Sequence, residues 1–304
     1  MTTTRASSGA RPHPGGLTSL AGRPVARIGY GAMQLEHGAD EPALAVLRRA
    51  VELGVDHIDT AEFYGAGRVN AHIRAALHPY PEHLVLAGKV GATSDPGGQY
   101  GLRPAQKPAE LRTELEANLR TLGAERLDVV NIYPMHRTPG IPADQRVDFD
   151  DQLAELIALR DAGLLGGIGL SHVDADQLRH ALPAGVVCVQ NAYSLVDRSS
   201  EPVLDLCREH GIAWVPYFPL GSGFPELPKV ADQPAVREVA TRLGATPSQV
   251  GLAWVLARGP RTLLIPGTRS IDHLEENLAA GDVVLDEEAL EALEALEVLA
   301  ALEG

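Results

Sequence analysis

The stretch His57-Ile-Asp-Thr-Ala-Glu-Phe-Tyr-Gly65 joins a strand-like apolar run to a short polar connection. Asp59 stands at the end of the run, and Tyr64 follows on the connection, just before a new helical pattern. A carboxylate at a strand end and a phenol on the following loop can project into one cleft. Taken alone, the same pair is typical of a capped turn and an ordinary loop aromatic. The meaning of this stretch therefore depends on the strands around it.

One unit repeats along the chain: an apolar β-branched run, a polar loop and an amphipathic helix. The strand candidates are 27–31, 56–60, 84–89, 127–133, 166–171, 186–190, 213–217 and 262–266. The helical patterns are 41–53, 68–77, 108–122, 149–162, 174–181, 200–210 and 246–258, with a last helix from Asp286 to about Leu302. This alternation predicts an α/β fold, a (β/α)8 TIM barrel. A doubly wound sheet would usually show G-x-G-x-x-G after its first strand, and Gly29-Tyr-Gly31-Ala-Met-Gln34 lacks the third glycine.

The 304 residues contain no convincing linker, so one barrel domain is expected over residues 17–304. Residues 1–16 are rich in Thr, Ser, Gly and Pro and are expected to form a disordered tail. A small β-hairpin is predicted over 17–28, where two short strands flank a Gly/Pro turn.

Charge and cysteine content exclude several classes of function. Forty acidic residues against 26 basic ones give a net charge of −14, which disfavours nucleic acid and anionic membrane surfaces as partners. No apolar run is long enough to span a bilayer, and no signal-peptide pattern is present. Cys188 and Cys207 have no C-x-x-C partner, so we expect a cytoplasmic protein without a disulfide framework or a metal site.

Polar residues gather at the predicted strand ends, where a barrel carries its chemistry. Lys89 ends the third strand, and His136 lies just past the fourth. A lysine that ends an apolar strand needs a partner, and Asp59 on the neighbouring strand is the natural one. Tyr64, Lys89 and Asp59 would together form a proton-donor unit, in which the lysine lowers the pKa of the phenol and the carboxylate holds the lysine. Each residue alone has an ordinary structural explanation, so their joint placement is what favours catalysis.

The chain resembles the aldo-keto reductase superfamily over about residues 17–302, most closely the bacterial branch that includes pyridoxal reductases. The motifs are GYGAMQL at 29–35, HIDTAEFYG at 57–65, AGKVG at 87–91, LDVVNIYPMH at 127–136, GIGLSH at 167–172, VQNAYS at 189–194, WVPYFPLGSG at 214–223 and IPGTRSIDHLEENL at 265–278. The resemblance implies a (β/α)8 barrel that binds NADPH/NADP+ without a Rossmann fold. It implies a catalytic tetrad of Asp59, Tyr64, Lys89 and His136, in which Tyr64 protonates the carbonyl oxygen and His136 orients it.

The same resemblance implies a cofactor site at the ends of the strands. Ser171 and Gln190 would hold the carboxamide, Tyr217 would stack under the nicotinamide, and Glu276 and Asn277 would hold the adenosine. The full cofactor set is Gly31, Ala32, Met33, Asp59, Ser171, His172, Gln190, Tyr217, Pro219, Leu220, Gly221, Ser222, Ile265, Gly267, Thr268, Arg269, His273, Glu276 and Asn277. The expected substrate contacts are Gln34, Phe63, Arg137 and Phe218.

The chain departs from the family pattern near the cofactor. His172 stands where Asn is frequent, and Gly267 and His273 replace a frequent Lys and Arg in the loop that holds the adenosine phosphate. Arg269 offers another cation for a 2′-phosphate, so NADPH remains favoured over NADH.

The resulting hypothesis is an NADPH-dependent reductase of an aldehyde or ketone, pyridoxal or a similar aldehyde among them. Two alternatives stay open at this point. One is a secondary-pathway tailoring enzyme of the same fold that performs dehydration or isomerisation. The other is a non-catalytic nicotinamide-binding regulatory subunit. The expected partner is a small carbonyl compound, and the sequence does not set the oligomeric state.

Overall fold

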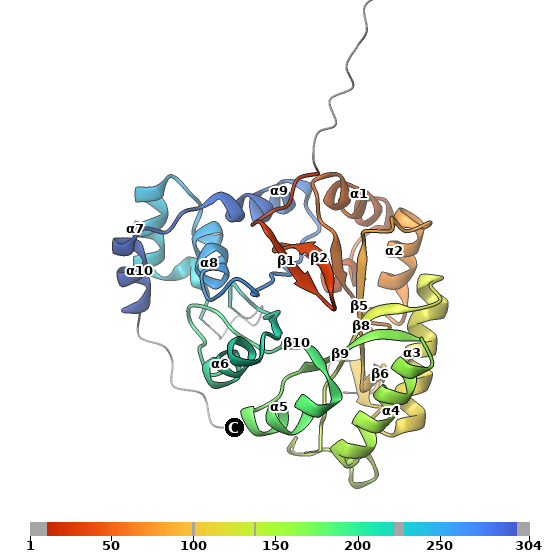
Figure 1. Ribbon diagram of the computed structural model, residues 1–304. Coiled ribbons are helices and arrows are strands. Elements are labelled where there is room, and N and C mark those ends of the chain that lie inside the picture. The colour runs from red at the N-terminus through yellow and green to blue at the C-terminus, as the bar shows by residue number, and fades with distance from the viewer. Residues whose placement is uncertain (1–10, 99–100, 137, 222–227, 297–304) are drawn as a thin grey trace, which may run out of the picture.

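A computed structural model describes residues 11–98, 101–136, 138–221 and 228–296. Its centre is a parallel sheet in which neighbouring strands follow one another in chain order (Figure 1). The strands are β3 (Tyr30–Gly31), β4 (His57–Asp59), β5 (Val85–Val90), β8 (Leu127–Ile132), β9 (Leu165–Ser171), β10 (Val186–Gln190) and β11 (Ala213–Trp214).

Residues 262–264 close this sheet into a ring. Thr262 forms a parallel bridge to Trp214, and Leu264 forms one to Ile28. The backbone N–H of Leu263 donates to the carbonyl of Trp214 at 2.8 Å, and Gly29 donates to Leu264 at 2.8 Å. The predicted barrel is therefore confirmed. Its eighth strand is only a pair of bridges, and Pro266, two residues after the second bridge, has no N–H to continue a ladder.

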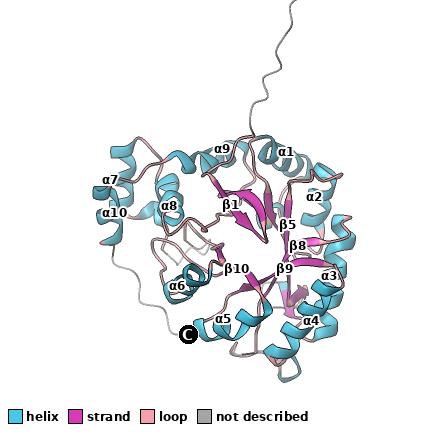
Figure 2. Cartoon of the chain, in the orientation of Figure 1, coloured by secondary structure: helices cyan, strands magenta, loops and turns pink. Residues whose placement is uncertain are grey.

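The predicted helices form the outer layer of the barrel (Figures 1 and 2). They are α1 (Asp40–Glu52), α2 (Arg68–Leu77), α3 (Pro108–Leu122), α4 (Phe149–Asp161), α5 (Ala175–Ala181), α6 (Glu201–His210) and α8 (Pro247–Leu256). Side chains cap several of them where the sequence supplies a cap, and in α5 Asp174 accepts from the N–H of Gln177 at 2.7 Å.

Several elements were not predicted from the sequence. They are α7 (Pro234–Leu243), α9 (Ile271–Ala279) and an antiparallel pair of β6 (Ala92–Ser94) and β7 (Leu102–Pro104). Short 3-10 turns occur at Met33–Glu36, Ala143–Gln145, Leu182–Ala184, Val230–Asp232 and Ala280–Asp282. The last helix, α10 (Glu287–Glu294), is shorter than expected within the described residues, and the predicted end near Leu302 lies outside them.

The predicted hairpin is present as β1 (Leu17–Leu20) and β2 (Arg23–Ala26), paired antiparallel. Leu20 and Val25 pack with Val85, Val129 and Leu263 of the barrel strands. The hairpin therefore fills one end of the barrel interior, and the opposite end, where the strands terminate, is left to polar side chains.

Residues 11–16 do not continue the expected disordered tail. Arg11 donates to the fully buried Asp56 at 2.6 Å, and the N–H of Ile28 donates to the carbonyl of Pro14 at 3.1 Å. A buried carboxylate needs a cation, so the segment is held against the barrel despite its Gly/Pro-rich composition. The first ten residues of the expected tail lie outside the described residues.

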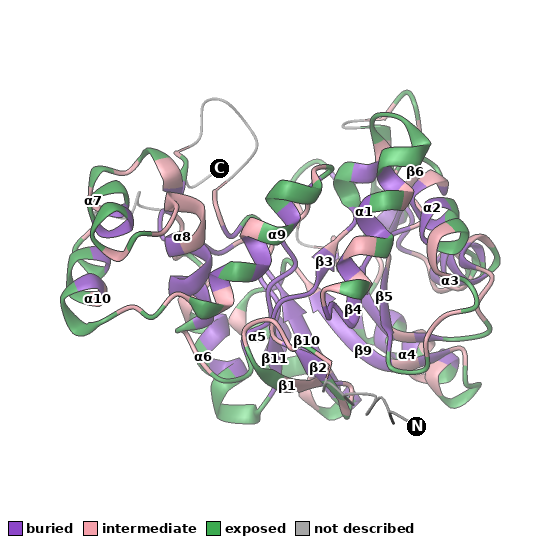
Figure 3. Cartoon of the chain, turned by 90° about the horizontal axis from the view of Figure 1, so that it is seen from above, coloured by how far each residue is buried: buried purple, intermediate pink, exposed green. Residues whose placement is uncertain are grey.

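Two apolar clusters hold the fold together. The larger one lies between the sheet and the surrounding helices, and the smaller one fills the barrel interior. Figure 3 shows the buried strands at the centre and exposed residues on the outer helix surfaces. In the described part of the chain, no helix is long and apolar enough to cross a membrane.

Candidate active site

Asp59, Lys89 and Gln190 meet inside the barrel at the ends of their strands. Asp59 pairs with Ala87 in the parallel register, so Lys89, two residues on, points to the same face. Lys89 Nζ donates to Asp59 Oδ1, and Gln190 Nε2 donates to Asp59 Oδ2 at 2.6 Å. Burial alone would lower the Lys89 pKa, but the charges and hydrogen bonds of Asp59 and Tyr64 together outweigh it and raise that pKa above its ordinary value. The lysine is therefore a fixed cation at neutral pH.

Tyr64 lies beside this ion pair. Lys89 Nζ is 5.0 Å from the centroid of its ring, and the phenol is half-buried on the loop after β4. Burial raises the pKa of Tyr64, the charge of Lys89 lowers it, and the net shift is upward. The lowered pKa predicted for this phenol from the sequence is wrong in direction, because the loss of solvation exceeds the attraction of the lysine. The phenol therefore keeps its proton at neutral pH.

His136 is placed against helix α4. Its ring stacks on Phe149 with centroids 5.7 Å apart, and Phe149 in turn lies 6.0 Å from the ring of His180. The role of His136 at the carbonyl stays a prediction.

The opposite rim of the barrel mouth carries aromatic and imidazole rings. Tyr217 Oη and His172 Nδ1 are 2.9 Å apart, and the His172 ring meets Tyr133 edge to face at 4.9 Å. Tyr217 also meets the exposed Phe218 at 5.0 Å. His172 and Phe218 both have φ of 55°, the left-handed region that non-glycine residues rarely adopt. His172 is exposed overall, but the protein atoms packed around its ring partly desolvate it and lower its pKa, so the ring is neutral at pH 7.

Two features of this mouth fit a nicotinamide cofactor. Within the described residues, Gln190 Oε1 is buried and has no hydrogen-bond partner, so it can accept from a carboxamide N–H. The half-buried Ser171 ends the adjacent strand, β9. No group of three or more His, Cys, Asp or Glu that could hold a metal occurs among the described residues.

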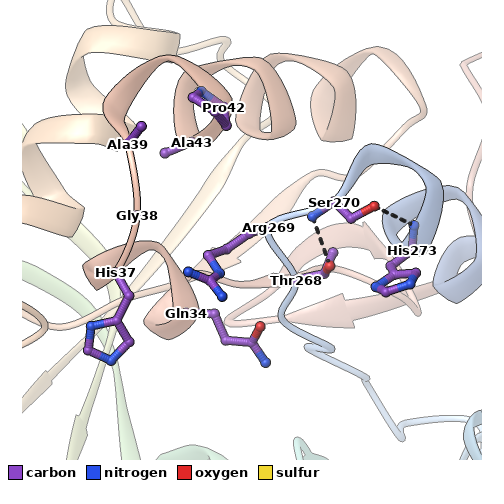
Figure 4. Close-up of a pocket in the computed structure, with 10 residues that line it drawn as sticks. All are labelled: Gln34, His37, Gly38, Ala39, Pro42, Ala43, Thr268, Arg269, Ser270 and His273. Atoms are coloured by element: carbon purple, nitrogen blue, oxygen red, sulfur yellow. Dashed lines mark hydrogen bonds between the residues drawn. The ribbon is translucent and has the colours of Figure 1, made fainter.

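A cavity of about 440 Å³ extends the site away from the mouth (Figure 4). It is lined by Gln34, His37, Gly38, Ala39, Pro42, Ala43, Thr268, Arg269, Ser270 and His273. Figure 4 shows Arg269 reaching across from the loop before α9 toward Gln34. Gln34 lines this cavity, and its contact with substrate stays a prediction. The α1 side of the cavity was not predicted, because its small residues carry no chemical signal.

The loop that carries Arg269 is packed tightly against β3. A Cβ at Gly267 would lie 2.6 Å from the carbonyl oxygen of Gly31, so this position has no room for the lysine frequent in the family. Tyr30 Oη donates to the carbonyl of Thr268 at 2.5 Å, and the Ser270 hydroxyl caps α9 at the N–H of His273. Arg269 is thereby the cation that the loop presents to the cavity.

The remaining predicted residues fall into three groups. Glu276 accepts from the hydroxyl of Thr246 at 2.6 Å, so it is engaged with the start of α8, and Asn277 is buried beside it on α9. The other described members are Gly31 at the end of β3, Ala32 and Met33 just after it, Phe63 on the loop after β4, Pro219, Leu220 and Gly221 beyond β11, and Ile265 after the bridge at Leu264. Arg137 and Ser222 lie outside the described residues.

Comparison with known proteins gives a consistent result. Residues 27–298 match the model of the aldo/keto reductase family. The pyridoxine 4-dehydrogenase of Escherichia coli strain K12 is 44% identical over 283 residues, covering 90% of this chain and 96% of that protein.

Two solved structures share the fold. A thermostable aldo-keto reductase in complex with the inhibitor epalrestat has a TM-score of 0.77 and 27% identity, covering 91% of this chain and 98% of its own. An aldo-keto reductase from Klebsiella pneumoniae in complex with NADPH has a TM-score of 0.75 and 25% identity, covering 89% and 90%.

Proposed function

The chain belongs to the aldo/keto reductase family, and we propose that it reduces an aldehyde or ketone to an alcohol with NADPH. One observation supports this most directly. The phenol of Tyr64 lies against a lysine that a buried carboxylate holds in place. This is a proton donor beside a fixed positive charge, as carbonyl reduction requires.

The roles of the residues follow from their charges. Tyr64 keeps its proton at neutral pH and gives it to the carbonyl oxygen, so that the oxygen becomes the alcohol hydroxyl. Lys89 stabilises the phenolate that remains, and Asp59 keeps Lys89 in position. His136 orients the carbonyl. Bound NADPH supplies the hydride that is added to the carbonyl carbon.

NADPH fits the residues that surround the mouth. Gln190 Oε1 and Ser171 offer hydrogen bonds to a carboxamide, and the ring of Tyr217 offers a flat surface for a nicotinamide. The cavity beside Arg269 offers a cation for a 2′-phosphate. A relative in complex with NADPH shares the fold, which supports the same choice.

A planar aromatic aldehyde is the substrate class we propose. Phe63 and Phe218 carry exposed or half-exposed rings beside Tyr64 and Tyr217. Such rings stack on a flat substrate. The 44% identity to a pyridoxine 4-dehydrogenase makes pyridoxal the first compound to test.

The test is NADPH oxidation by the purified protein with pyridoxal, benzaldehyde and a short aliphatic aldehyde. We expect turnover with the aromatic aldehydes and weaker turnover with the aliphatic one. Tight NADPH binding without turnover of any carbonyl would replace the proposal by a nicotinamide-binding regulatory subunit. Titration with NADPH and NADH tests the cofactor, and tighter binding of NADH would contradict the choice.

A further inference from the structure

A cluster of five polar side chains lies behind the catalytic strands, on the side away from the barrel interior. Its members are Thr60, Glu62, Asn70, Asn118 and Thr121, and we call them the amide network. Thr60 follows β4, Asn70 belongs to α2, and Asn118 and Thr121 belong to α3. Thr60, Asn70 and Asn118 are fully buried.

Asn70 is the centre of the network. Its Oδ1 accepts from the hydroxyl of Thr60 at 2.7 Å. Its Nδ2 lies 3.1 Å from Glu62 Oε2, 3.1 Å from Thr121 Oγ1 and 3.2 Å from Asn118 Oδ1. The amide therefore uses both its acceptor and its donors, and its contacts join the segment after β4 to helix α3.

Two further contacts extend the network. Thr121 Oγ1 donates to Glu62 Oε2 at 2.6 Å, so that carboxylate oxygen is held from two sides. Asn118 Nδ2 donates to the backbone carbonyl of Lys89 at 3.2 Å. Gly67, with φ of 85°, closes the loop by donating to the Glu62 carbonyl at 2.6 Å, and a Cβ there would lie 2.7 Å from Glu62 Oε1.

The network touches the chain next to each member of the proton-donor unit. Thr60 directly follows Asp59, and Glu62 stands two residues before Tyr64. Lys89 is bound through its own carbonyl. Asp59 and Lys89 are held by their strands, but Tyr64 stands on a loop, and loops need side-chain contacts to keep one geometry.

We propose that Asn70 is a positioning residue for the proton transfer, which it serves by fixing the Tyr64 loop relative to Lys89. The inference rests on the proposed reduction chemistry. Rate depends steeply on alignment, because a misplacement of about 1 Å costs on the order of 100-fold. Asn70 does not touch the reacting atoms and acts only through Glu62 and Thr60.

A purely structural role makes a different prediction. If the network only joins α2 to α3, its loss lowers the unfolding temperature but leaves the turnover of each folded molecule unchanged. The two roles are therefore separated by rates measured well below the unfolding temperature and corrected for the folded fraction.

The experiment compares four variants of the full chain. Asn70→Leu removes the amide, Thr121→Val removes one hydroxyl at constant shape, and Glu62→Gln keeps an oxygen acceptor. Tyr80→Phe is the matched control, because Tyr80 Oη donates to the Leu122 carbonyl at the end of the same helix α3.

We expect Asn70→Leu to lower kcat by roughly 10- to 100-fold with unchanged cofactor affinity, because alignment and not binding is lost. Thr121→Val should lower kcat less, Glu62→Gln should retain most activity, and Tyr80→Phe should retain all of it. Unchanged kcat in both Asn70→Leu and Thr121→Val overturns the proposal. If Asn70→Leu does not fold, Thr121→Val alone decides.

A second readout separates this inference from the proposed function. The titration of the Tyr64 phenol is obtained as the ultraviolet difference between each protein and its Tyr64→Phe counterpart. Asn70→Leu should move the midpoint, since the distance to Lys89 changes. If the parent protein reduces no carbonyl, the proposed function fails while a moved midpoint still supports the positioning role. In an active protein, an unmoved midpoint together with an unchanged kcat refutes the positioning role. In a protein that reduces no carbonyl, an unmoved midpoint is enough to refute it.

Discussion

The two sides of the barrel mouth are built differently. Asp59, Lys89 and Gln190 project from strands and are largely buried, and both Lys89 and Gln190 bind Asp59 directly. On the opposite rim, His172 and Phe218 are exposed, stand just beyond strand ends and have positive φ. The first side holds charge in one place, and the second presents flat rings toward whatever enters the mouth. Chemistry is therefore anchored in the sheet, and recognition is placed on the loops.

The difference has a cost on each side. A buried ion pair is tolerated only when its polar atoms are satisfied, so a change on the strand side affects stability and turnover together. A non-glycine residue with positive φ costs about 1–3 kcal/mol and is kept only where its surroundings impose it. Changes at the rim are therefore expected to affect binding with little effect on folding. The following predictions, taken from the largest effect to the smallest, test this contrast.

Lys89→Met should be the most damaging change. It leaves the buried Asp59 without its cation, which should lower the free energy of unfolding by about 3 kcal/mol. This value is at the lower end of the range for a broken buried ion pair, because Gln190 still donates to Asp59. Turnover should also collapse. Denaturant unfolding and steady-state kinetics measure both, and a variant of normal stability would show that Asp59 does not depend on this pair.

Tyr64→Phe should abolish proton donation with the fold intact. We expect a loss of at least ~100-fold in kcat, the scale that general acid catalysis supplies, with cofactor affinity largely kept. Single-turnover kinetics and cofactor titration test this prediction. Full activity in this variant would refute the assigned role.

Arg269→Gln should act on the loop side of the contrast, in the cavity that continues the site beyond the mouth. Loss of the guanidinium removes charged hydrogen bonds to a 2′-phosphate, which weakens NADPH binding by roughly 10- to 100-fold and leaves NADH binding unchanged. The unfolding midpoint should not move, since Arg269 is exposed. Equal weakening for both cofactors would place the phosphate elsewhere.

The pH dependence of reduction should follow the Tyr64 phenol. Its folded pKa is raised above the ordinary value of 10, so the proton is present throughout the neutral range and is lost only above pH 10. Lys89 stays charged over the same window, because its pKa is also raised. The kcat for reduction should therefore be flat in the neutral range and fall at strongly alkaline pH, whereas alcohol oxidation should rise with pH. A fall centred near neutrality would point to another titrating group.

Tyr217→Phe should have the smallest effect. It removes the hydrogen bond between Tyr217 and His172 but keeps the ring. Because one such hydrogen bond contributes about 1 kcal/mol or less, the Kd for the cofactor should rise only a few-fold. Fluorescence titration with NADPH measures this. A loss of kcat as large as that expected for Tyr64→Phe would mean that the rim takes part in the chemistry.

The strand side could be predicted largely from local sequence. Asp59 and Tyr64 are close in the chain, and the parity of the next strand directs Lys89 to the same face, so pattern alone brought these groups together. The raised pKa of Tyr64 could not be predicted, because it depends on how much solvent the folded mouth excludes. The contact between Gln190 and Asp59 joins residues 131 positions apart and follows only from ring closure.

At the rim and the cavity, even less could be predicted from local sequence. The motif at 265–278 predicted a cofactor loop, but it did not explain Gly267, whose missing side chain is required by the carbonyl of Gly31 on β3. Gln34 was predicted to contact substrate, but the sequence did not show that it lies beside Arg269 in one cavity. The packing of Arg11 on Asp56 was hidden by a composition typical of disorder.

The sequence by itself determined the repeat of strands and helices, the residues at the strand ends and their chemical types, since period and residue identity are local properties. The tertiary structure decided which of these groups touch, how deeply each is buried and which loops meet at the cavity. These properties depend on closure of the barrel, in which residues 262–264 bridge Trp214 on one side and Ile28 on the other. The segment from His57 to Gly65 illustrates both: its Asp59 and Tyr64 are visible in the sequence, and the contacts of its Thr60 and Glu62 in the amide network exist only after α2 and α3 pack behind the sheet.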